Sequence, residues 1–283
     1  MLVSVYLPTK NRAALLRKAV DSVLTQTFPT IELIIVNDGS TDGTFGYTEE
    51  VAARDARVRV IHNATSIGAP GSRNLAIEAA RGDFVTGLDD DDRFHPQRIS
   101  AFVEYWQVLE RIGESFSCLY SQDIAEKGGK WIRGVKPGGV CWKDLFYCNG
   151  IGNQIFAKRQ TFVSAGLFDD RMPAWQDLDL FIRILRESGP AKLLDAGLYI
   201  VNIDQRADRI SSKGSKQKVL SAYRNLEAKW RSCPRIMRQG LYLQAFGHFY
   251  GIKPNPIDLL TFFRMGVYPR TLKALAGIYL RRA

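Results

Sequence analysis

The chain has few cysteine and histidine residues and lacks any long apolar run. Its 283 residues include four cysteines and three histidines, and neither set shows the paired spacing of a metal site. We therefore expect reduced thiols and histidines without a metal. No uncharged apolar stretch reaches the ~20 residues of a membrane-spanning helix, and the N terminus does not resemble a signal peptide. These absences predict a cytoplasmic protein without an integral membrane segment.

Internal repeats and low-complexity tracts are also absent. A hydrophobic content of 46% over 283 residues is enough to bury a sizeable core and leaves little room for long disordered segments. The composition favours one compact folded unit over a string of modules.

The most informative motif is a run of four carboxylates, Asp89-Asp90-Asp91-Asp92. Residues 82–88 are typical of a strand entered through a turn, and Pro96 indicates a helix that starts near Arg98. Adjacent ionised carboxylates repel one another, and a divalent cation such as Mg²⁺ or Mn²⁺ relieves that repulsion. The alternative is a solvated acidic turn or helix cap.

Strand and helix patterns alternate before this run. Residues 2–7, 31–36 and 58–61 predict strands, and helices are expected over 13–26 and after the segment 68–74. This order predicts a parallel sheet with right-handed crossovers, in which polar residues at the carboxyl ends of strands line a ligand site.

Five stretches of the chain resemble, in order and spacing, the inverting family 2 glycosyltransferases with the GT-A fold. The matching stretches, which span about residues 2–186, are VSVYLPTKNR, IELIIVNDGSTDGT, residues 68–74 with their Arg-Asn pair, GDFVTGLDDDD followed by Pro96, and AGLFDDRMPAWQDLDLFIRI. The resemblance implies a metal-dependent transfer of a sugar from a nucleotide donor, with UDP as the expected nucleotide.

The resemblance also implies the residues of a nucleotide pocket, which are Pro8, Thr9, Asn11, Asp38 and Arg73. For Asp38, simple turn and cap chemistry is the alternative.

In the same resemblance, the acidic run contains the family's DXD element. Asp91 and Asp89 would be the positions for Mn²⁺ or Mg²⁺, with Asp91 the direct ligand, and Asp90 would lie close to the ribose. Asp92 extends the run and could serve as a second ligand.

The catalytic base is expected in the segment Trp175-Gln176-Asp177-Leu178-Asp179. Asp177 matches the base position of the family, although Gln176 departs from the usual Glu-Asp pair. Asp179 is the rival, because two residues one step apart on an extended segment face the same side. An N-cap role for Asp177 is the third possibility.

Arg206 and Arg209 are candidate contacts for the donor diphosphate. They follow a strand predicted at 199–203, in a segment without apolar periodicity, and related enzymes carry a loop here that folds over the donor. A solvated charge run explains the same pattern.

Basic charge is concentrated at the C-terminal end. Residues 224–283 contain 11 Lys and Arg against Glu227 and Asp258, a net charge of +9 out of +10 for the chain. Basic residues alternate there with large apolar ones, which predicts peripheral contact with an anionic membrane. A helical subdomain packed on the catalytic domain is the alternative, and no nucleic-acid module is present.

We therefore expect an α/β protein with a GT-A-like nucleotide-binding fold, a mostly parallel central sheet and a helical C-terminal segment. The expected units are a catalytic domain over 1–204, divided into a nucleotide-sugar half (1–96) and an acceptor half (97–204), a flexible loop over 205–223 and the basic helical segment 224–283. The expected acceptor is a glycan, in particular a lipid-linked saccharide of surface polysaccharide synthesis at the inner face of the membrane. A nucleotidyltransferase and a non-catalytic relative that binds nucleotide sugars are the alternatives.

Overall fold

The computed structural model describes residues 1–127, 129–203, 216–247, 250 and 252–280. The strands are β1 (Val3–Thr9), β2 (Ile31–Asp38), β3 (Val58–Asn63), β4 (Phe84–Gly87), β5 (Arg93–Phe94), β6 (Cys118–Lys127), β7 (Lys130–Arg133), β8 (Gly139–Val140), β9 (Phe156–Lys158) and β10 (Ala191–Ile200). The helices are α1 (Ala13–Leu24), α2 (Thr44–Arg54), α3 (Gly68–Ala79), α4 (Arg98–Arg111), the 3₁₀ helix η1 (Asp144–Phe146), α5 (Arg159–Ser164), α6 (Gln176–Ser188), α7 (Lys216–Lys229), α8 (Arg235–Gln244), α9 (Pro256–Arg264) and α10 (Pro269–Leu280).

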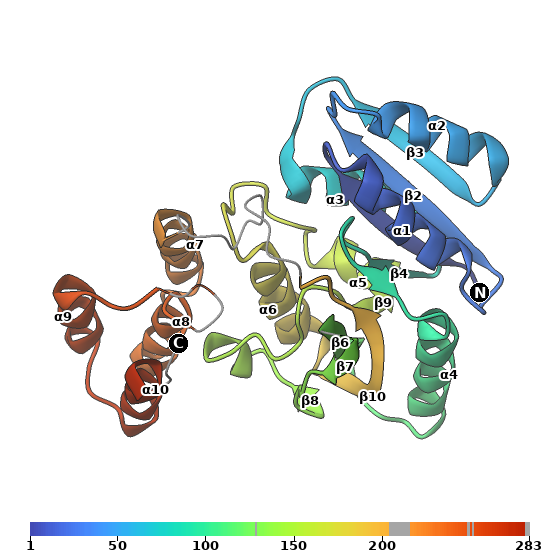
Figure 1. Ribbon diagram of the computed structural model, residues 1–283. Helices are drawn as coiled ribbons and strands as arrows, with labels where there is room; N and C mark the ends of the chain where they lie inside the picture. The colour runs from blue at the N-terminus through green and yellow to red at the C-terminus, as the bar shows by residue number, and fades with distance from the viewer. Residues whose placement is uncertain (128, 204–215, 248–249, 251, 281–283) are drawn as a thin grey trace.

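The strands form one sheet in the order β3-β2-β1-β4-β9-β6-β10-β5, with β7 beside β6 and β8 beside β10. The longest ladders, β1 with β2, β2 with β3 and β6 with β10, are parallel. β4 lies on the other side of β1 from β2 and is also parallel to it. The chain order therefore reverses at β1, and the α/β fold with a mostly parallel sheet is confirmed (Figure 1).

Helices cover both faces of the sheet because alternate residues of its strands are apolar on both sides. Val5 and Leu7 of β1 belong to a core layer with α1 and α4, whereas Tyr6 between them belongs to a second layer with α3 and α6. Buried side chains of α7 and α8, among them Leu226 and Leu241, extend this second layer.

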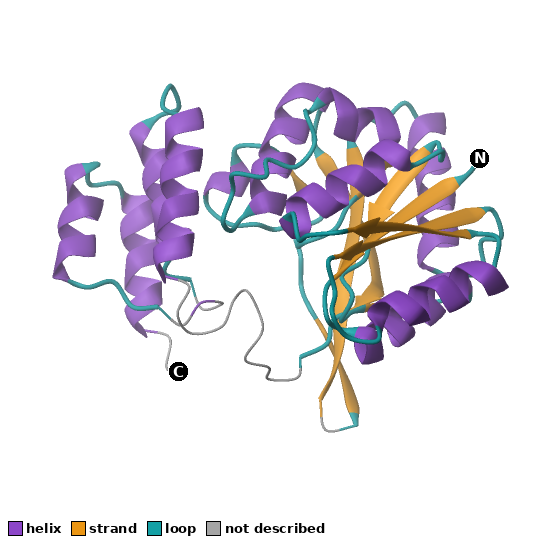
Figure 2. Cartoon of the chain, turned by 90° about the horizontal axis from the view of Figure 1, so that it is seen from above, coloured by secondary structure: helices purple, strands orange, loops and turns teal. Residues whose placement is uncertain are grey.

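The C-terminal helices therefore pack on the α/β part of the chain, and Figure 2 shows them as a group at one side of the α/β layers. No helix in the described part of the chain has the length and apolar character required to cross a membrane.

Three elements near the candidate site and the C-terminal helices depart clearly from the sequence expectation. Helix α3 begins at Gly68, so residues 68–74 form its first two turns and do not precede it. Strand β10 ends at Ile200, earlier than the expected strand 199–203. Helix α7 begins at Lys216 within the expected loop 205–223.

Candidate active site

The carboxyl ends of β1, β2 and β4 meet at one edge of the sheet because the three strands are parallel. In this register Thr9 lies beside Asn37, one residue before Asp38, and the acidic run begins two residues after β4 ends. The Thr9 hydroxyl donates to Asp90 Oδ2 at 2.8 Å, and Arg12 Nη1 donates to Asp90 Oδ1 at 2.9 Å. The structure thus brings the first strand and the acidic run together at the reversal of strand order, where α/β sheets bind ligands.

Asp38 is buried and accepts four hydrogen bonds from the entry to α3. Asn63 Nδ2 and the backbone N–H of Ile67 donate to Oδ1, both at 2.8 Å, and Ser66 Oγ and the backbone N–H of Gly68 donate to Oδ2, at 2.5 and 2.9 Å. Burial works to raise the pKa of this carboxyl, but the hydrogen bonds outweigh it and lower the pKa below its ordinary value. All four acceptor positions of the carboxylate are used, so Asp38 shapes the site by holding this loop.

Pro8 and Asn11 also lie at this edge. Pro8 is half-buried at the end of β1. Asn11 adopts a left-handed backbone conformation (φ 54°), and its Oδ1 accepts from the backbone N–H of Thr41 at 2.7 Å. Asn11 therefore joins the loop after β1 to the loop after β2, a role compatible with a pocket wall.

Asp89 is the hub of a polar network. Arg73 Nη2 donates to its Oδ1 at 3.2 Å, Gln154 Nε2 to the same oxygen at 3.1 Å, and Asn153 Nδ2 to Oδ2 at 2.6 Å. The Tyr6 hydroxyl in turn donates to Gln154 Oε1 at 2.9 Å. These bonds join β1, α3 and the segment before β9 to the acidic run.

Sequence reasoning missed Asn153, Gln154 and Asn149. A usable signal was the stretch Asn149-Gly-Ile-Gly-Asn-Gln, in which amide side chains alternate with glycine and Gly152 has φ 100°. Asn residues beside a glycine with positive φ indicate a turn, but nothing local says that this turn reaches Asp89.

Two carboxyl groups of the acidic run, Asp90 and Asp92, have raised pKa values. Burial raises the pKa of Asp90 to about 6, although Arg12 and Thr9 oppose the shift. Burial, together with the charges of Asp89 and Asp91, raises the pKa of Asp92 to about 8. Negative charge is therefore unfavourable here, and a bound cation would relieve it.

Asp177 lies in the first turn of α6, half-buried, and accepts from Asn149 Nδ2 at 3.1 Å. Burial raises the pKa of its carboxyl, while backbone hydrogen bonds of the helix start and the charge of Arg73 oppose this. Arg73 connects the start of α6 to the acidic run. Its Nη1 donates to Gln176 Oε1 at 3.0 Å, and its Nη2 donates to Asp89 Oδ1 at 3.2 Å. Gln176, the departure from the family pattern, thus gives Arg73 a neutral partner beside Asp177.

Asp179 does not share this position. The segment is helical, so the two carboxylates are about 200° apart around α6, and the expectation that both face one side is wrong. Asp179 is fully buried and ion-paired with Arg183 (2.8 Å) and Lys229 (2.7 Å). An N-cap role for Asp177 is also wrong, because Trp175 holds the N-cap position.

This edge of the sheet carries a run of carboxylates, an arginine that bridges two segments, and a half-buried acid. Comparison with known proteins identifies the family. The profile described as Glycosyl transferase family 2 matches residues 4–132. A protein of Escherichia coli (strain K12) named as a colanic acid biosynthesis glycosyl transferase, WcaA, is 36% identical over 220 residues, covering 76% of this chain and 77% of that protein. The chain belongs to glycosyl transferase family 2.

Other relatives of this glycosyltransferase agree. EpsJ of Bacillus subtilis (strain 168), named as a glycosyltransferase, is 31% identical over 221 residues, covering 70% of this chain and 60% of EpsJ. A glycosyltransferase of Rickettsia bellii (strain RML369-C) is 27% identical over 241 residues; the match covers 82% of this chain but 33% of that protein. The nucleotidyltransferase alternative is not supported.

Solved structures show the same fold. S. aureus TarS 1-349 aligns with a TM-score of 0.68 at 17% identity, covering 97% of this chain and 83% of that one. The mannosyltransferase PcManGT of Pyrobaculum calidifontis, in complex with GDP-Man and Mn²⁺, aligns with a TM-score of 0.57 at 18% identity, covering 98% and 73%. These similarities establish the GT-A-like fold of the glycosyltransferase.

The acidic run fits a divalent cation that also binds a substrate diphosphate. In the described residues, no group of three or more His, Cys, Asp or Glu forms a metal-binding cluster. Mg²⁺, however, is often held by one or two carboxylates, with phosphate and water completing its shell. The side chain of Asp91 is 14% exposed, and its Oδ2 lies 3.6 Å from Arg12 Nη1. Asp89 already accepts hydrogen bonds from Arg73, Asn153 and Gln154. Asp91 and Asp89 stay the two predicted ligands. Arg206 and Arg209 lie outside the described residues.

Proposed function

We propose that this glycosyltransferase transfers a sugar from a UDP-sugar to a glycan acceptor with inversion at the anomeric carbon. The observation that carries the proposal is the Arg73 bridge, which joins the acidic run at one side to the start of α6, with Asp177, at the other. TarS has been solved with UDP-GlcNAc, which supports UDP as the nucleotide. Pro8, Thr9, Asn11, Asp38 and Asp90 would shape the nucleotide side of the pocket, and Asp90 would lie near the ribose.

In this mechanism Asp177 is the general base. It takes the proton of the acceptor hydroxyl while that oxygen forms a bond to the anomeric carbon. The bond from that carbon to the diphosphate oxygen breaks on the opposite face, and its electron pair leaves with UDP. Burial favours this role, because a raised pKa brings the carboxylate closer to the basicity that proton abstraction needs.

Arg73 and the amides of Asn153 and Gln154 fix Asp89, and through it the acidic run, before the donor arrives. Asp91, with Asp89, would hold Mn²⁺ or Mg²⁺. When bound, this cation would neutralise the charge that develops on the leaving diphosphate.

The proposed acceptor is a lipid-linked saccharide of surface polysaccharide synthesis. The name of the E. coli relative, a colanic acid biosynthesis glycosyl transferase, supports the polysaccharide part of this proposal. Membrane contact fits this acceptor. Helix α9 exposes Ile257 (72%), Leu260 (52%) and Phe263 (46%), and Val267 (64%) follows it. These apolar side chains, with Lys253 and Arg264 beside them, would lie in the headgroup region of an anionic leaflet.

The proposal is tested with a panel of UDP- and GDP-sugars, first by thermal shift with Mn²⁺ or EDTA and then by transfer to a lipid-linked saccharide extract. We expect a UDP-sugar to stabilise the protein with Mn²⁺, and Asp91→Asn to abolish turnover while the fold survives.

Asp177→Asn should lower kcat by ~10²-fold or more and leave UDP binding unchanged. Full activity in excess chelator refutes the metal role, and retention of the donor's anomeric configuration refutes the mechanism. UDP binding without hydrolysis or transfer would indicate a non-catalytic relative.

A further inference from the structure

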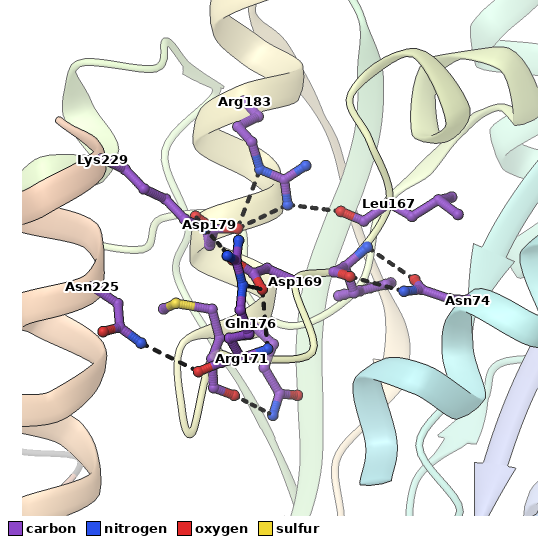
Figure 3. Close-up of polar contacts among 11 residues, drawn as sticks. Asn74, Leu167, Asp169, Arg171, Gln176, Asp179, Arg183, Asn225 and Lys229 are labelled. Carbon is purple, nitrogen blue, oxygen red and sulfur yellow. Dashed lines mark hydrogen bonds and ion pairs between the residues drawn. The ribbon is translucent and has the colours of Figure 1, made fainter. Parts of the chain in front are cut away.

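The first turn of α6 has two functional sides. On one side Asp177 accepts a hydrogen bond from Asn149 at the candidate site. On the other side Asp179 contacts Lys229 of α7 (Figure 3). Because a helix turn is rigid, whatever fixes Asp179 also fixes the direction of Asp177.

Lys229, at the end of α7, makes the connection from the C-terminal segment. Its Nζ lies 2.7 Å from Asp179 Oδ1 and 2.7 Å from Asp169 Oδ2. Asn225, one turn earlier on the same helix, donates to the backbone carbonyl of Arg171 at 3.2 Å (Figure 3). Helix α7 thus holds both α6 and the 169–171 loop that leads into it.

Arg183 cannot replace this contact. It pairs with Asp179 four residues away on α6 itself and donates to the carbonyl of Leu167 at 2.7 Å, so it anchors α6 to the preceding loop and not to α7. A cavity of about 500 Å³, lined by Lys229, Asp169 and Arg183 among others, opens beside the contact. Apolar side chains of α7, among them Leu226, pack in the same core layer as α6, and the ion pair of Lys229 adds a polar connection that ends at Asp179 itself.

A second contact reaches the same turn from its N-terminal end. Trp175, the N-cap residue of α6, has a left-handed backbone (φ 58°), which is strained for a bulky residue. Its indole Nε1 donates to the Tyr250 hydroxyl at 2.7 Å. Tyr250 belongs to the C-terminal segment between α8 and α9. Burial raises the pKa of its hydroxyl, and the negative charge of Asp177 adds to this increase.

We propose that the C-terminal helical segment is a part of the active site, in which Lys229 and Tyr250 are positioning residues that hold the first turn of α6 and so aim Asp177 at the acceptor hydroxyl. This inference rests on the proposed role of Asp177 as base. It assigns to the C-terminal helices a catalytic contribution that is independent of any membrane contact.

The test compares two lysines of α7. Lys229→Met removes the contact with α6, and Lys216→Met is the matched control, because Lys216 makes an ion pair of the same length (2.7 Å) with Asp258 inside the C-terminal segment. Each full-length variant is assayed for UDP release from the UDP-sugar that gives the largest thermal shift, with the lipid-linked extract as acceptor. Hydrogen exchange at residues 175–180 is measured in parallel.

We expect Lys229→Met to lower kcat ~10- to 100-fold, the range for a misplaced catalytic group, with a donor KM within about twofold of wild type, and to speed exchange at the α6 start. Lys229→Arg should restore most of the activity because it keeps the charge. Tyr250→Phe, which removes the partner of Trp175, should lower kcat in the same manner. Lys216→Met should leave kcat and exchange at α6 unchanged.

A double variant separates this inference from the base assignment. Added to Asp177→Asn, Lys229→Met should reduce the residual rate by less than about twofold, because a positioning residue has nothing left to position. An equal factor in both backgrounds, or equal losses for the Lys229 and Lys216 variants, overturns the positioning role. Asp177→Asn alone reports on the base, and the comparison of the two lysines reports on the C-terminal segment.

Discussion

The four hydrogen bonds to Asp38 give the sharpest stability prediction, for the isosteric change Asp38→Asn. An asparagine has one acceptor oxygen and one N–H₂ group. The Ser66 hydroxyl can rotate and the Asn63 amide can flip to suit it, but the backbone N–H groups of Ile67 and Gly68, on opposite oxygens, can do neither. In either orientation of the new amide one of them loses its acceptor.

The cost combines a lost hydrogen bond to a charged group with a part-buried donor left unsatisfied, and we expect about 1–3 kcal/mol less free energy of unfolding at pH 7. Urea titration measures it as a lower midpoint at unchanged m-value. Asp83→Asn is the control, since that carboxylate has a side chain 65% exposed and accepts one backbone bond, from Leu2 at 2.9 Å. It should change stability by less than about 0.5 kcal/mol.

The difference should also depend on pH. The folded-state pKa of Asp38 is lowered, below the value of about 3.9 of an unfolded chain. The ionised carboxylate therefore stabilises the fold fully above that value, and the contribution is lost as pH falls through the folded-state pKa. Wild type and Asp38→Asn should converge in acid. A loss below 0.5 kcal/mol at pH 7, or one that stays constant as pH falls below 3.9, refutes this account of the loop.

Three further predictions concern the site and the surface. Gly87→Ala should destabilise by about 1–3 kcal/mol and slow transfer, because the new Cβ would overlap Gln154 Oε1 and the Tyr6 ring; a variant with wild-type melting and activity contradicts the packing. The pKa of Asp177 is raised, and a general base acts only when it is deprotonated. The value of kcat should therefore rise with pH through a midpoint above about 3.9. A kcat that is flat from pH 4 to 7 contradicts the assignment of Asp177 as base. Leu260→Asp should weaken co-sedimentation with anionic vesicles, which salt should also weaken; equal binding to neutral vesicles would argue against the proposed contact.

The sequence by itself determined the fold and the edge of the sheet at which the candidate site lies. Continuous apolar runs and apolar stripes of period 3.6 are local properties, and they placed β1, α1, β2 and β4 close to their observed positions. The parallel order then brings Thr9, Asp38 and Asp89 to one edge, because parallel strands share the direction of their ends. The resemblance in five stretches gave the family, which the comparisons confirm.

Only the tertiary structure decided the partners of these residues. The helical path of α6 separates Asp177 from Asp179, which a two-residue spacing alone did not reveal. Lys229 reaches Asp179 across 50 residues of sequence and Asn153 reaches Asp89 across 64. Such contacts depend on the packing of whole elements, and no local pattern encodes them because the residues become neighbours only when the chain is folded.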